Sequence, residues 1–526
     1  MGQWKRIQTT DAPVRQRMNE GLTSTEQTVL DAGTEWIDAN TDLLLSFLDA
    51  LVGRPGLSGE EGVSDDPETP VGVLSDQLDA TLDAPGFHVE TQRIHPEHDY
   101  VDAPRENLYT IVNGAGDGGF VCTSHTDVVP AGDPTAWPND DPFTVTEGTV
   151  HWRGGTTIDI ELDGERYTRE IREKMARVWR LRDRASAPVL VGRGVYDNKS
   201  SSVCLVGSLL GLQAALGATD TRLGGDLVHG HLVDEEVYQI GVKEMVGWHG
   251  GENWLGNRYD SLADFTAVVL EGSYGFVPVI GHRGLAWVVL EATGTAAHAS
   301  TPELGTNAVL GMSRALVALE EGLPARLGEI FVDEDVLGRL TVAPGTTVVG
   351  GGVEAVEADS RRVERSGLNS VPDWCEATLD IRLPRWTDFP KGVDDICGRL
   401  VDRVESVAAE AAPDVTFDAR VPDDNFFPPV ALAGSTEAAT DHPLVRTAAT
   451  TTASRLGFDP GVDVAPGATD AAFLYHGTRI PTLVEYGPAG GLSHEALEYV
   501  ERDQVVEGAK VMLELTLREL GIVDAE

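Results

Sequence analysis

An apolar run, Leu227-Val228-His229-Gly230-His231-Leu232-Val233, ends just before two neighbouring glutamates, Glu235 and Glu236. Its length and apolar character predict a buried strand that delivers both carboxylates at its C-terminal end. Three other apolar runs end in the same way, in His125-Thr126-Asp127, in Gly192-Arg193-Gly194-Val195-Tyr196-Asp197 and in Glu271. Open α/β sheets bind their ligands at the C-terminal edge of the strands. An imidazole and several carboxylates at one such edge therefore predict a metal site.

The chain around these runs alternates between strand and helix patterns. Apolar periodicity predicts a helix over 41–52, and a second helix over 200–216 directly follows the Asp197 loop. This rhythm indicates an α/β fold with a mostly parallel sheet and helices on both faces. The charged stretch 152–187 separates the His125 and Asp197 motifs. We expect it to be a surface insertion made of a hairpin and a helix around residues 170–182.

From Val279 the pattern changes to the order β-α-β-β-α-β. Four strands are predicted at 285–292, 346–353, 375–383 and 415–421, and two helices at 307–323 and 394–411. This order is typical of a split-βαβ, ferredoxin-like α+β domain. A helix at 444–456, a strand at 482–486 and a helix at 503–520 then return to the α/β style. We therefore expect a polar N-terminal extension (1–35), a large domain in two parts (36–278 and 426–526) and an inserted small domain (279–425).

The composition excludes several classes of partner. With 85 acidic and 40 basic residues, the formal net charge of −45 disfavours binding to nucleic acid or to anionic membranes. We interpret this charge as that of a protein from a cytoplasm of molar salt, in preference to that of an ordinary acidic protein. At molar salt the electrostatic screening length is about 3 Å, so the acidic residues repel each other only weakly. No apolar run has the roughly 18 residues of a membrane helix. The N-terminus lacks the apolar core of a secretion signal, and the four cysteines show no paired spacing, so a cytoplasmic protein without disulfides is expected.

The residues at the strand ends suit distinct tasks. His125 and Asp127 share one face of a strand end, so Asp127 can accept a hydrogen bond from the far imidazole nitrogen and orient the ring. Asp197 lies in a turn after Gly194, where its carboxylate can reach two metals or can cap the helix that follows. Glu235 and Glu236 point to different sides. One of them can bind metal while the other faces the substrate as a base.

Five motifs, in order, resemble those of the M20 metallopeptidase family, which contains acetylornithine deacetylase, succinyl-diaminopimelate desuccinylase, aminoacylase and glutamate carboxypeptidase. The motifs are Ser124-His125-Thr126-Asp127-Val128-Val129-Pro130, Gly192-Arg193-Gly194-Val195-Tyr196-Asp197-Asn198-Lys199, Asp234-Glu235-Glu236, Gly467-Ala468-Thr469-Asp470-Ala471 and Ser493-His494-Glu495. The match covers about residues 40–520. It implies a zinc-exopeptidase-like fold with an inserted lid and dimerisation domain.

The resemblance also implies the cofactor and the role of each site residue. Two Zn²⁺ ions per chain are expected, and Co²⁺ is a possible substitute. The expected ligands are His125, Asp197 and Glu271 for one ion, and Asp197, Glu236 and His494 for the other, with Asp197 bridging. Glu235 is the expected general base on the activated water, and Asp127 the partner of His125.

Three further residues are implied within the inserted domain. By resemblance, His298 reaches the active site of the partner subunit and stabilises the oxyanion, which implies a homodimer. Asn369 and Arg382 resemble contacts to the substrate carboxylate. The alternative interpretations are an ordinary loop histidine for His298, a turn residue for Asn369 and a charge on a sheet face for Arg382. The chain departs from the family at Ser200, where glycine is common, and at Ala472, where many members carry an arginine.

The main hypothesis is a co-catalytic zinc amidohydrolase that cleaves an N-acyl amino acid, of the deacetylase or desuccinylase type. A dipeptidase or carboxypeptidase of the same family is the nearest alternative. A catalytically silent homologue that binds amino acids or peptides is an alternative of another class, although every expected ligand and the base are present. A module that only dimerises leaves five motifs unexplained.

Overall fold

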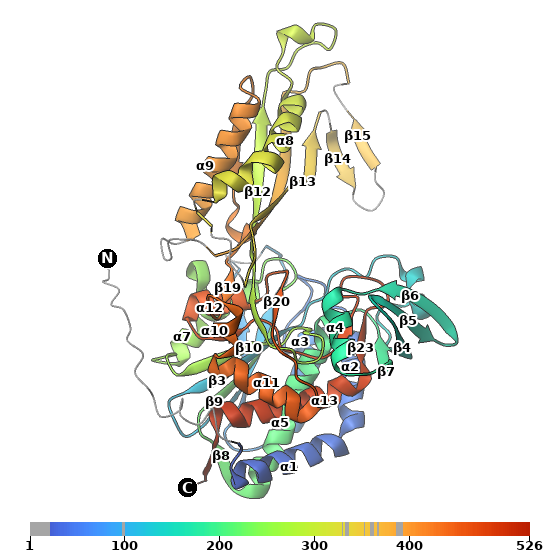
Figure 1. Ribbon diagram of the computed structural model, residues 1–526, viewed down its shortest axis with the longest axis vertical. Helices are drawn as coiled ribbons and strands as arrows, with labels where there is room; N and C mark the ends of the chain where they lie inside the picture. The colour runs from blue at the N-terminus through green and yellow to red at the C-terminus, as the bar shows by residue number, and fades with distance from the viewer. Residues whose placement is uncertain are drawn as a thin grey trace. The chain divides into compact units, whose positions relative to one another are not determined.

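The computed structural model describes residues 21–96, 100–328, 330–331, 336–351, 353–357, 362–365, 368–385 and 393–525 (Figure 1). These residues form two compact units. Unit 1 comprises Met1–Ile280, Thr436–Asp463 and Thr469–Glu526, and unit 2 comprises Gly281–Ser435 and Val464–Ala468. Unit 2 is thus inserted in the chain of unit 1. Its main segment ends ten residues beyond the boundary expected at residue 425.

The main sheet of unit 1 has six strands in the order β1-β2-β9-β3-β10-β21. Neighbouring strands run parallel from β9 to β21, and the two strands at the other edge are antiparallel. The strands are β1 (Phe87–Arg93), β2 (Glu106–Val112), β3 (Gly119–His125), β9 (Asp226–Leu232), β10 (Phe265–Val269) and β21 (Thr482–Leu483). All seven residues of β3 are buried, as expected for a strand covered on both faces.

Helices cover both faces of this sheet, which confirms the predicted fold class. On one face, Ser202 of α5 (Ser200–Thr219) contacts His231 of β9. On the other face, the Tyr109 ring of β2 stacks on Trp254 of α7 (Trp254–Arg258), with 3.8 Å between ring centroids. Helix α13 (Arg502–Leu520) lies on the sheet beside α5, since its Glu519 contacts Thr266 of β10, and α1 (Ser24–Ala39) packs on α5 and α13 (Figure 1).

Helix α1 changes the expected N-terminal boundary. Residues 1–20 of the expected extension lie outside the described residues, but residues 24–35 are helical and belong to unit 1. A capping box of Thr23 and Glu26 starts the helix. Its apolar face is buried, and Gly33 lies so close to Gly211 of α5 that an added Cβ would be 3.0 Å from the Gly211 carbonyl oxygen. The segment is polar on average, so its composition did not predict a helix with a narrow apolar face.

Helix α5 has a composition that would also suit a membrane. Among the described residues, the stretch Val195–Thr219 passes a length and hydropathy test for a membrane span. Of the most apolar part of this stretch, 72% is buried inside the protein. Packing between the sheet, α1 and α13 therefore accounts for its apolar character.

A second sheet of unit 1 corrects one expectation about the Asp197 strand. Residues Ser186–Val191 form β7, which lies in an antiparallel sheet of order β22-β23-β7-β4-β5-β6 and not in the main sheet. The other strands are β4 (Thr146–Gly154), β5 (Thr157–Leu162), β6 (Glu165–Glu170), β22 (Gly490–Gly491) and β23 (Tyr499–Glu501). An apolar run alone does not reveal the sheet to which a strand belongs, because pairing depends on residues far away in the chain.

Residues 152–187 form much of this second sheet. They contain the β5–β6 hairpin and the helix α4 (Glu173–Leu181). Ile160 and Trp179 lie in a hydrophobic core together with Val189 of β7 and Tyr499 of β23. The segment is therefore built into unit 1 by its own core.

Unit 2 has the strand order of a ferredoxin-like fold. Its sheet runs β13-β16-β12-β17 with all neighbours antiparallel. The elements are β12 (Gly284–Thr293), α8 (Ala308–Leu327), β13 (Thr341–Gly350), β16 (Trp374–Leu383), α9 (Val393–Ala411) and β17 (Thr416–Arg420). Helices α8 and α9 lie side by side over one face (Figure 1), where alternate residues of β12 and β16 are buried. A small hairpin of β14 (Val353–Glu357) and β15 (Arg362–Arg365) follows β13.

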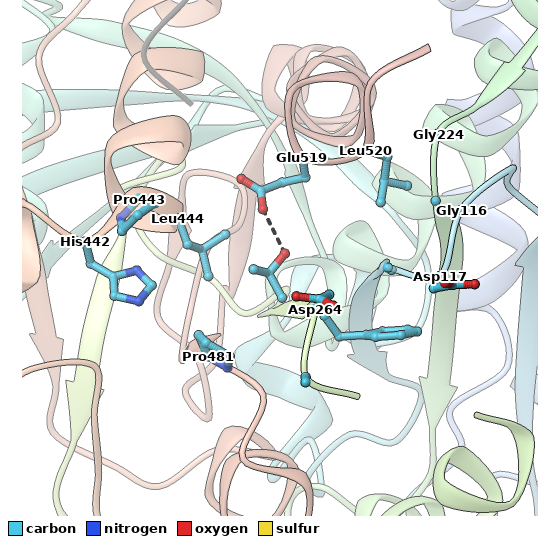
Figure 2. Close-up of a pocket in the computed structure, with 16 residues that line it drawn as sticks. Gly116, Asp117, Gly224, Asp264, His442, Pro443, Leu444, Pro481, Glu519 and Leu520 are labelled. Atoms are coloured by element: carbon cyan, nitrogen blue, oxygen red, sulfur yellow. Dashed lines mark hydrogen bonds between the residues drawn. The ribbon is translucent and has the colours of Figure 1, made fainter. Parts of the chain in front are cut away.

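A cavity of about 300 Å³ lies at the N-terminal ends of the main-sheet strands (Figure 2). Gly119 and Phe265, the first residues of β3 and β10, line it together with Leu444 and Glu519. Glu519 is buried, and one of its oxygens accepts a hydrogen bond of 2.8 Å from the Thr266 hydroxyl. This cavity marks the edge of the sheet opposite to the strand ends where the motifs lie.

Candidate metal centre

The predicted site residues of unit 1 converge at the C-terminal edge of the main sheet. His125 is the last residue of β3, and Glu271 lies two residues beyond β10. Glu235 and Glu236 follow β9, which pairs with β3 in parallel. Parallel neighbours end at the same edge, so these side chains meet there without a long connection. Asp197 arrives from the turn between β7 and α5, and His494 from the loop between β22 and β23.

Two imidazoles lie on either side of Asp197. The Nε2 atom of His125 is 3.1 Å from Asp197 Oδ1 and 3.3 Å from Glu271 Oε1. The Nε2 atom of His494 is 3.3 Å from Asp197 Oδ2 and 2.9 Å from Glu236 Oε2. Each carboxylate oxygen of Asp197 thus faces a different histidine. The structure brings each expected ligand set together around one imidazole.

The donor set fits divalent metal ions. Among the described residues, His125, Glu235 and Glu271 form one group, and His125, Asp197 and Glu236 another, with the ligand atoms of each group within 4.8 Å of one another. The buried Oε1 atom of Glu236 has no hydrogen-bond partner among the described residues. Several buried carboxylates in one site repel each other unless a cation balances them. Imidazole and carboxylate ligands together suit zinc and cobalt.

The pKa values of the site follow from this crowding. Burial raises the pKa of Glu236 to about 7, and burial also raises the pKa of Glu235 well above its ordinary value. Hydrogen bonds to Asp197 and Glu236 raise the pKa of His494 to about 10. Burial opposes ionisation of Asp197, but hydrogen bonds from the two histidines outweigh it and lower its pKa. These pKa shifts share one cause, because the clustered carboxylates favour additional positive charge in the site. A metal ion would supply that charge.

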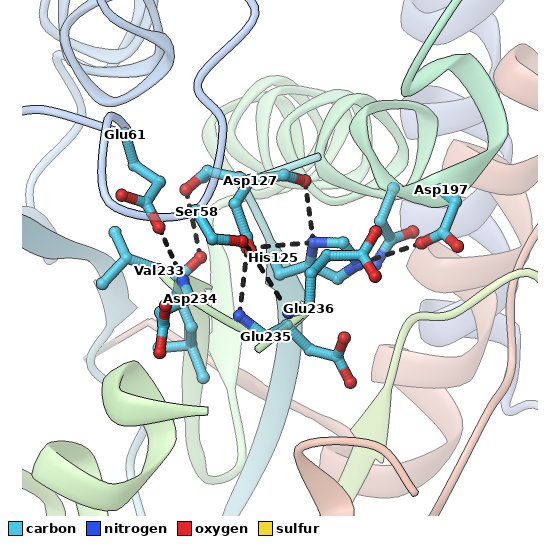
Figure 3. A network of polar contacts seen from close by, with 12 residues as sticks. Ser58, Glu61, His125, Asp127, Asp197, Val233, Asp234, Glu235 and Glu236 are labelled. Atoms are coloured by element: carbon cyan, nitrogen blue, oxygen red, sulfur yellow. Dashed lines mark hydrogen bonds and ion pairs between the residues drawn. The ribbon is translucent and has the colours of Figure 1, made fainter. Parts of the chain in front are cut away.

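Asp127 connects the imidazole of His125 with the glutamate turn (Figure 3). Its Oδ1 atom lies 3.3 Å from His125 Nδ1 and accepts a bond of 3.0 Å from the amide of Glu235. Its Oδ2 atom accepts from the amide of Glu236 at 3.2 Å and from the Ser58 hydroxyl at 2.6 Å. One buried carboxylate therefore orients a histidine and a turn that come from two different strands. The main-chain oxygen of Asp127 is also 3.1 Å from His125 Nδ1.

Ser58 and Asp470 are among the described residues near the site that were not predicted as site residues. Ser58 lies in a loop rich in glycine and serine, and nothing in its sequence context distinguishes it from other loop serines. Asp470 is part of a recognised motif, but no role was given to it. It is almost fully buried at the start of α12 (Ala471–Thr478), and its Oδ1 atom lacks a hydrogen-bond partner among the described residues. Burial raises its pKa well above the ordinary value, and the nearby Glu271 adds to this effect.

A family model matches most of the chain. Residues 175–518 match the model of peptidase family M20/M25/M40. The chain belongs to this family. The span includes four of the five motifs and all of unit 2, whereas the motif of His125 precedes it.

Curated relatives of this M20 protein include succinyl-diaminopimelate desuccinylases. It is 27% identical over 384 residues to the succinyl-diaminopimelate desuccinylase of Methylobacterium nodulans. The aligned region covers 72% of this chain and 79% of the relative. It is 25% identical over 461 residues to the enzyme of the same name from Methylobacterium sp. strain 4-46. The aligned region covers 87% of this chain and 91% of that relative.

Solved structures share the fold of this M20 protein. An M20 family metallo-carboxypeptidase from Sulfolobus solfataricus superposes with a TM-score of 0.59 at 15% identity, and covers 90% of this chain and 99% of its own. A dinuclear metal-binding M20 peptidase from Bacillus subtilis gives a TM-score of 0.52 at 13% identity, with 91% and 98% covered. At these identities the likeness establishes the fold.

The three site residues predicted in unit 2 divide into a pair and a single residue. The loop of His298 pairs with that of Asn369, since the amide of Ala299 donates to the Asn369 carbonyl at 2.7 Å and residues 298 and 370 form a β-bridge. The exposed His298 ring contacts the Ser300 hydroxyl at 2.8 Å. Arg382 lies on β16, and its guanidinium binds both oxygens of Asp380 at 2.8 and 2.9 Å. A substrate carboxylate would have to compete with Asp380 for this arginine.

Proposed function

We propose that this M20 protein is a dinuclear zinc amidohydrolase that removes the acyl group from an N-acyl amino acid. The observation that carries the proposal is the position of Asp197, with one oxygen towards each of two imidazoles. The proposed ligands are His125, Asp197 and Glu271 for one ion and Asp197, Glu236 and His494 for the other. The names of the Methylobacterium relatives and of the Bacillus subtilis neighbour support the substrate class and the number of ions.

The chain's own residues have defined tasks in this proposal. Two zinc ions would supply a Lewis acid that polarises the amide carbonyl and makes water more acidic. Glu235 takes a proton from the attacking water and gives it to the departing amine nitrogen. The Gln239 side chain donates to Glu235 Oε1 at 3.0 Å, which directs the other oxygen to the reaction. Asp127 holds the imidazole of His125 in the orientation that a metal needs.

We propose that unit 2 is a lid and dimerisation domain. Leu310 and Val317 of α8 and Val348 of the edge strand β13 are large apolar side chains more than half exposed. Such a surface favours a homodimer, in which His298 would reach the partner's site and stabilise the oxyanion. Asn369 and Arg382 are the proposed substrate contacts. We also propose a cytoplasmic location and a halophilic origin, which the formal net charge of −45 supports.

A dipeptidase or carboxypeptidase is the second candidate. The carboxypeptidase among the structural neighbours and the peptidase from Bacillus subtilis favour it. Ala472 stands where many family members have an arginine, so any recognition of a substrate carboxylate has to come from elsewhere.

A substrate panel with a matched variant tests the proposal. N-succinyl, N-acetyl and unblocked dipeptide substrates are assayed with zinc and with cobalt at high salt, and bound metal is counted. We expect turnover of an N-acyl amino acid and about two metal ions per chain. Glu235→Ala is expected to keep the metal and lose turnover by at least about a thousandfold. Full activity of that variant, or a purified protein that binds no metal, would refute the proposal.

A further inference from the structure

The turn that carries Glu235 and Glu236 is held at three successive main-chain amides. Asp127 accepts from the amides of Glu235 and Glu236, at 3.0 and 3.2 Å. The preceding amide, that of Asp234, donates to Glu61 Oε1 at 2.9 Å. Asp234 has a φ of 65°, in the left-handed region that residues other than glycine rarely adopt. Glu61 therefore fixes the part of the turn that is least favourable on its own.

A single buried arginine joins Glu61 to the side chain of Asp234. The Nη1 atom of Arg105 lies 3.2 Å from both oxygens of Glu61 and 3.3 Å from Asp234 Oδ1. None of these three side chains is more than 1% exposed. The Tyr100 hydroxyl donates to Asp234 Oδ1 at 2.5 Å, and the guanidinium lies 5.2 Å from the centre of the Tyr100 ring. Figure 3 shows Glu61 and Asp234 on the side of Asp127 away from Asp197.

The turn that carries Asp197 is held in the same way. Glu498 is fully buried and pairs with the buried Arg193. Its Oε1 atom accepts from the amides of Tyr196 and Asp197, at 3.0 and 2.9 Å. The turns that present Glu235, Glu236 and Asp197 thus each rest on a buried glutamate that is paired with a buried arginine.

We propose that Arg105 is a positioning residue that, through Glu61 and Asp234, fixes the directions of the Glu235 and Glu236 side chains. Arg105 binds Glu61 and Asp234, and Glu61 binds the amide of Asp234, so the arginine acts on the two glutamates through the turn. Without the charge of Arg105, the carboxylates of Glu61 and Asp234 would remain buried next to Asp127. Movement of the turn towards water would lower the free energy of these buried charges. Movement of the turn would displace the proposed base and a proposed metal ligand together. This inference rests on the proposed function for the roles of Glu235 and Glu236.

Substitution of Arg105 tests the proposal with readouts that loss of stability alone does not change. We expect Arg105→Met, fully loaded with metal, to lower kcat by about 10–100-fold with KM within about twofold. We also expect zinc affinity to weaken about tenfold and the visible spectrum of the cobalt form to change, because Glu236 moves. Arg105→Lys keeps the charge and should recover part of kcat. If Arg105→Met does not fold, the same readouts on Arg105→Lys decide, with at least about a threefold loss of kcat expected.

The matched control is Arg455→Met. Arg455 pairs with the buried Glu514 on helix α13, away from the carboxylate turns. This variant should lose stability but keep kcat, zinc affinity and the cobalt spectrum. If the Arg105 variants behave like Arg455→Met, the positioning role is refuted. Zinc affinity and the cobalt spectrum need no substrate, so this result is separable from a failure of the substrate panel.

Discussion

The two edges of the main sheet solve the burial of carboxylates in different ways. At the N-terminal edge, Glu519 stands in a cavity with the Thr266 hydroxyl as its donor, and burial raises its pKa to about 7 (Figure 2). At the C-terminal edge, Asp197, Glu236 and Glu271 surround two imidazoles. A lone buried carboxylate can take up a proton and remain neutral. A cluster of carboxylates around imidazoles requires more positive charge, which a metal ion would supply.

Removal of the metal should have the largest effect, and only at the C-terminal edge. A chelator is expected to lower turnover by at least about a thousandfold, and refilling with zinc or cobalt should restore it. The melting temperature should fall as well, because ions that bind only the native state stabilise it. Activity assays and thermal melts before and after dialysis against chelator measure both effects. Unchanged activity and melting in the chelated protein would contradict the metal centre.

Glu519 should give a pH dependence of stability at the opposite edge. Its pKa is about 7 in the folded protein against an ordinary value of 4.5, so the folded state holds the proton more tightly. The stability that this group contributes is complete below about pH 4.5 and is lost as the pH rises to about 7. Relative to Glu519→Gln, the wild type should lose about 2–3 kcal/mol of unfolding free energy between pH 5 and pH 8. Denaturant titrations of both proteins at the two pH values measure this difference. Parallel curves would show that Glu519 is not the group that titrates.

Asp127 offers a smaller change at the C-terminal edge. Asp127→Asn keeps one acceptor oxygen but loses the charge that orients His125 and holds the two glutamate amides. We expect kcat to fall by about 10–100-fold and zinc affinity to weaken by a similar factor. Ser58→Ala removes a single hydrogen bond to the same carboxylate and serves as the milder comparison. Steady-state kinetics and metal titration on both variants test this order, which equal losses would contradict.

The smallest expected effect concerns the net charge of the whole protein and belongs to neither edge of the sheet. With a formal net charge of −45, self-repulsion should destabilise the protein when salt is removed. We expect the melting temperature to fall by several degrees between molar salt and about 0.1 M, where screening extends to about 10 Å. Thermal melts across a salt series measure it. A melting temperature that does not depend on salt would remove the support for a halophilic origin.

Much of the fold followed from local patterns. The apolar periodicity of 41–52 predicted α2 (Thr41–Val52) with the observed bounds, and the β-α-β-β-α-β order predicted the architecture of unit 2. Failures occurred where partners are distant. The pattern of β7 did not reveal its antiparallel sheet, and the polar composition before residue 35 concealed α1. Arg105 and Glu61 carry no local signal either, because only the fold brings them to Asp234.

By itself, the sequence determined which residue types end the buried strands, and thus the kind of chemistry that one edge of the sheet can hold. Alternation and apolar runs are local properties, so a strand and the carboxylate that follows it can be read together. The resemblance to the M20 motifs predicted that Asp197 bridges the two ligand sets, but only the tertiary structure shows that it reaches His125 and His494 from a strand of a different sheet. It also decided which buried arginines balance the glutamates beneath the turns. Distances of about 3 Å between residues dozens of positions apart are set by packing, and no periodicity in the chain encodes them.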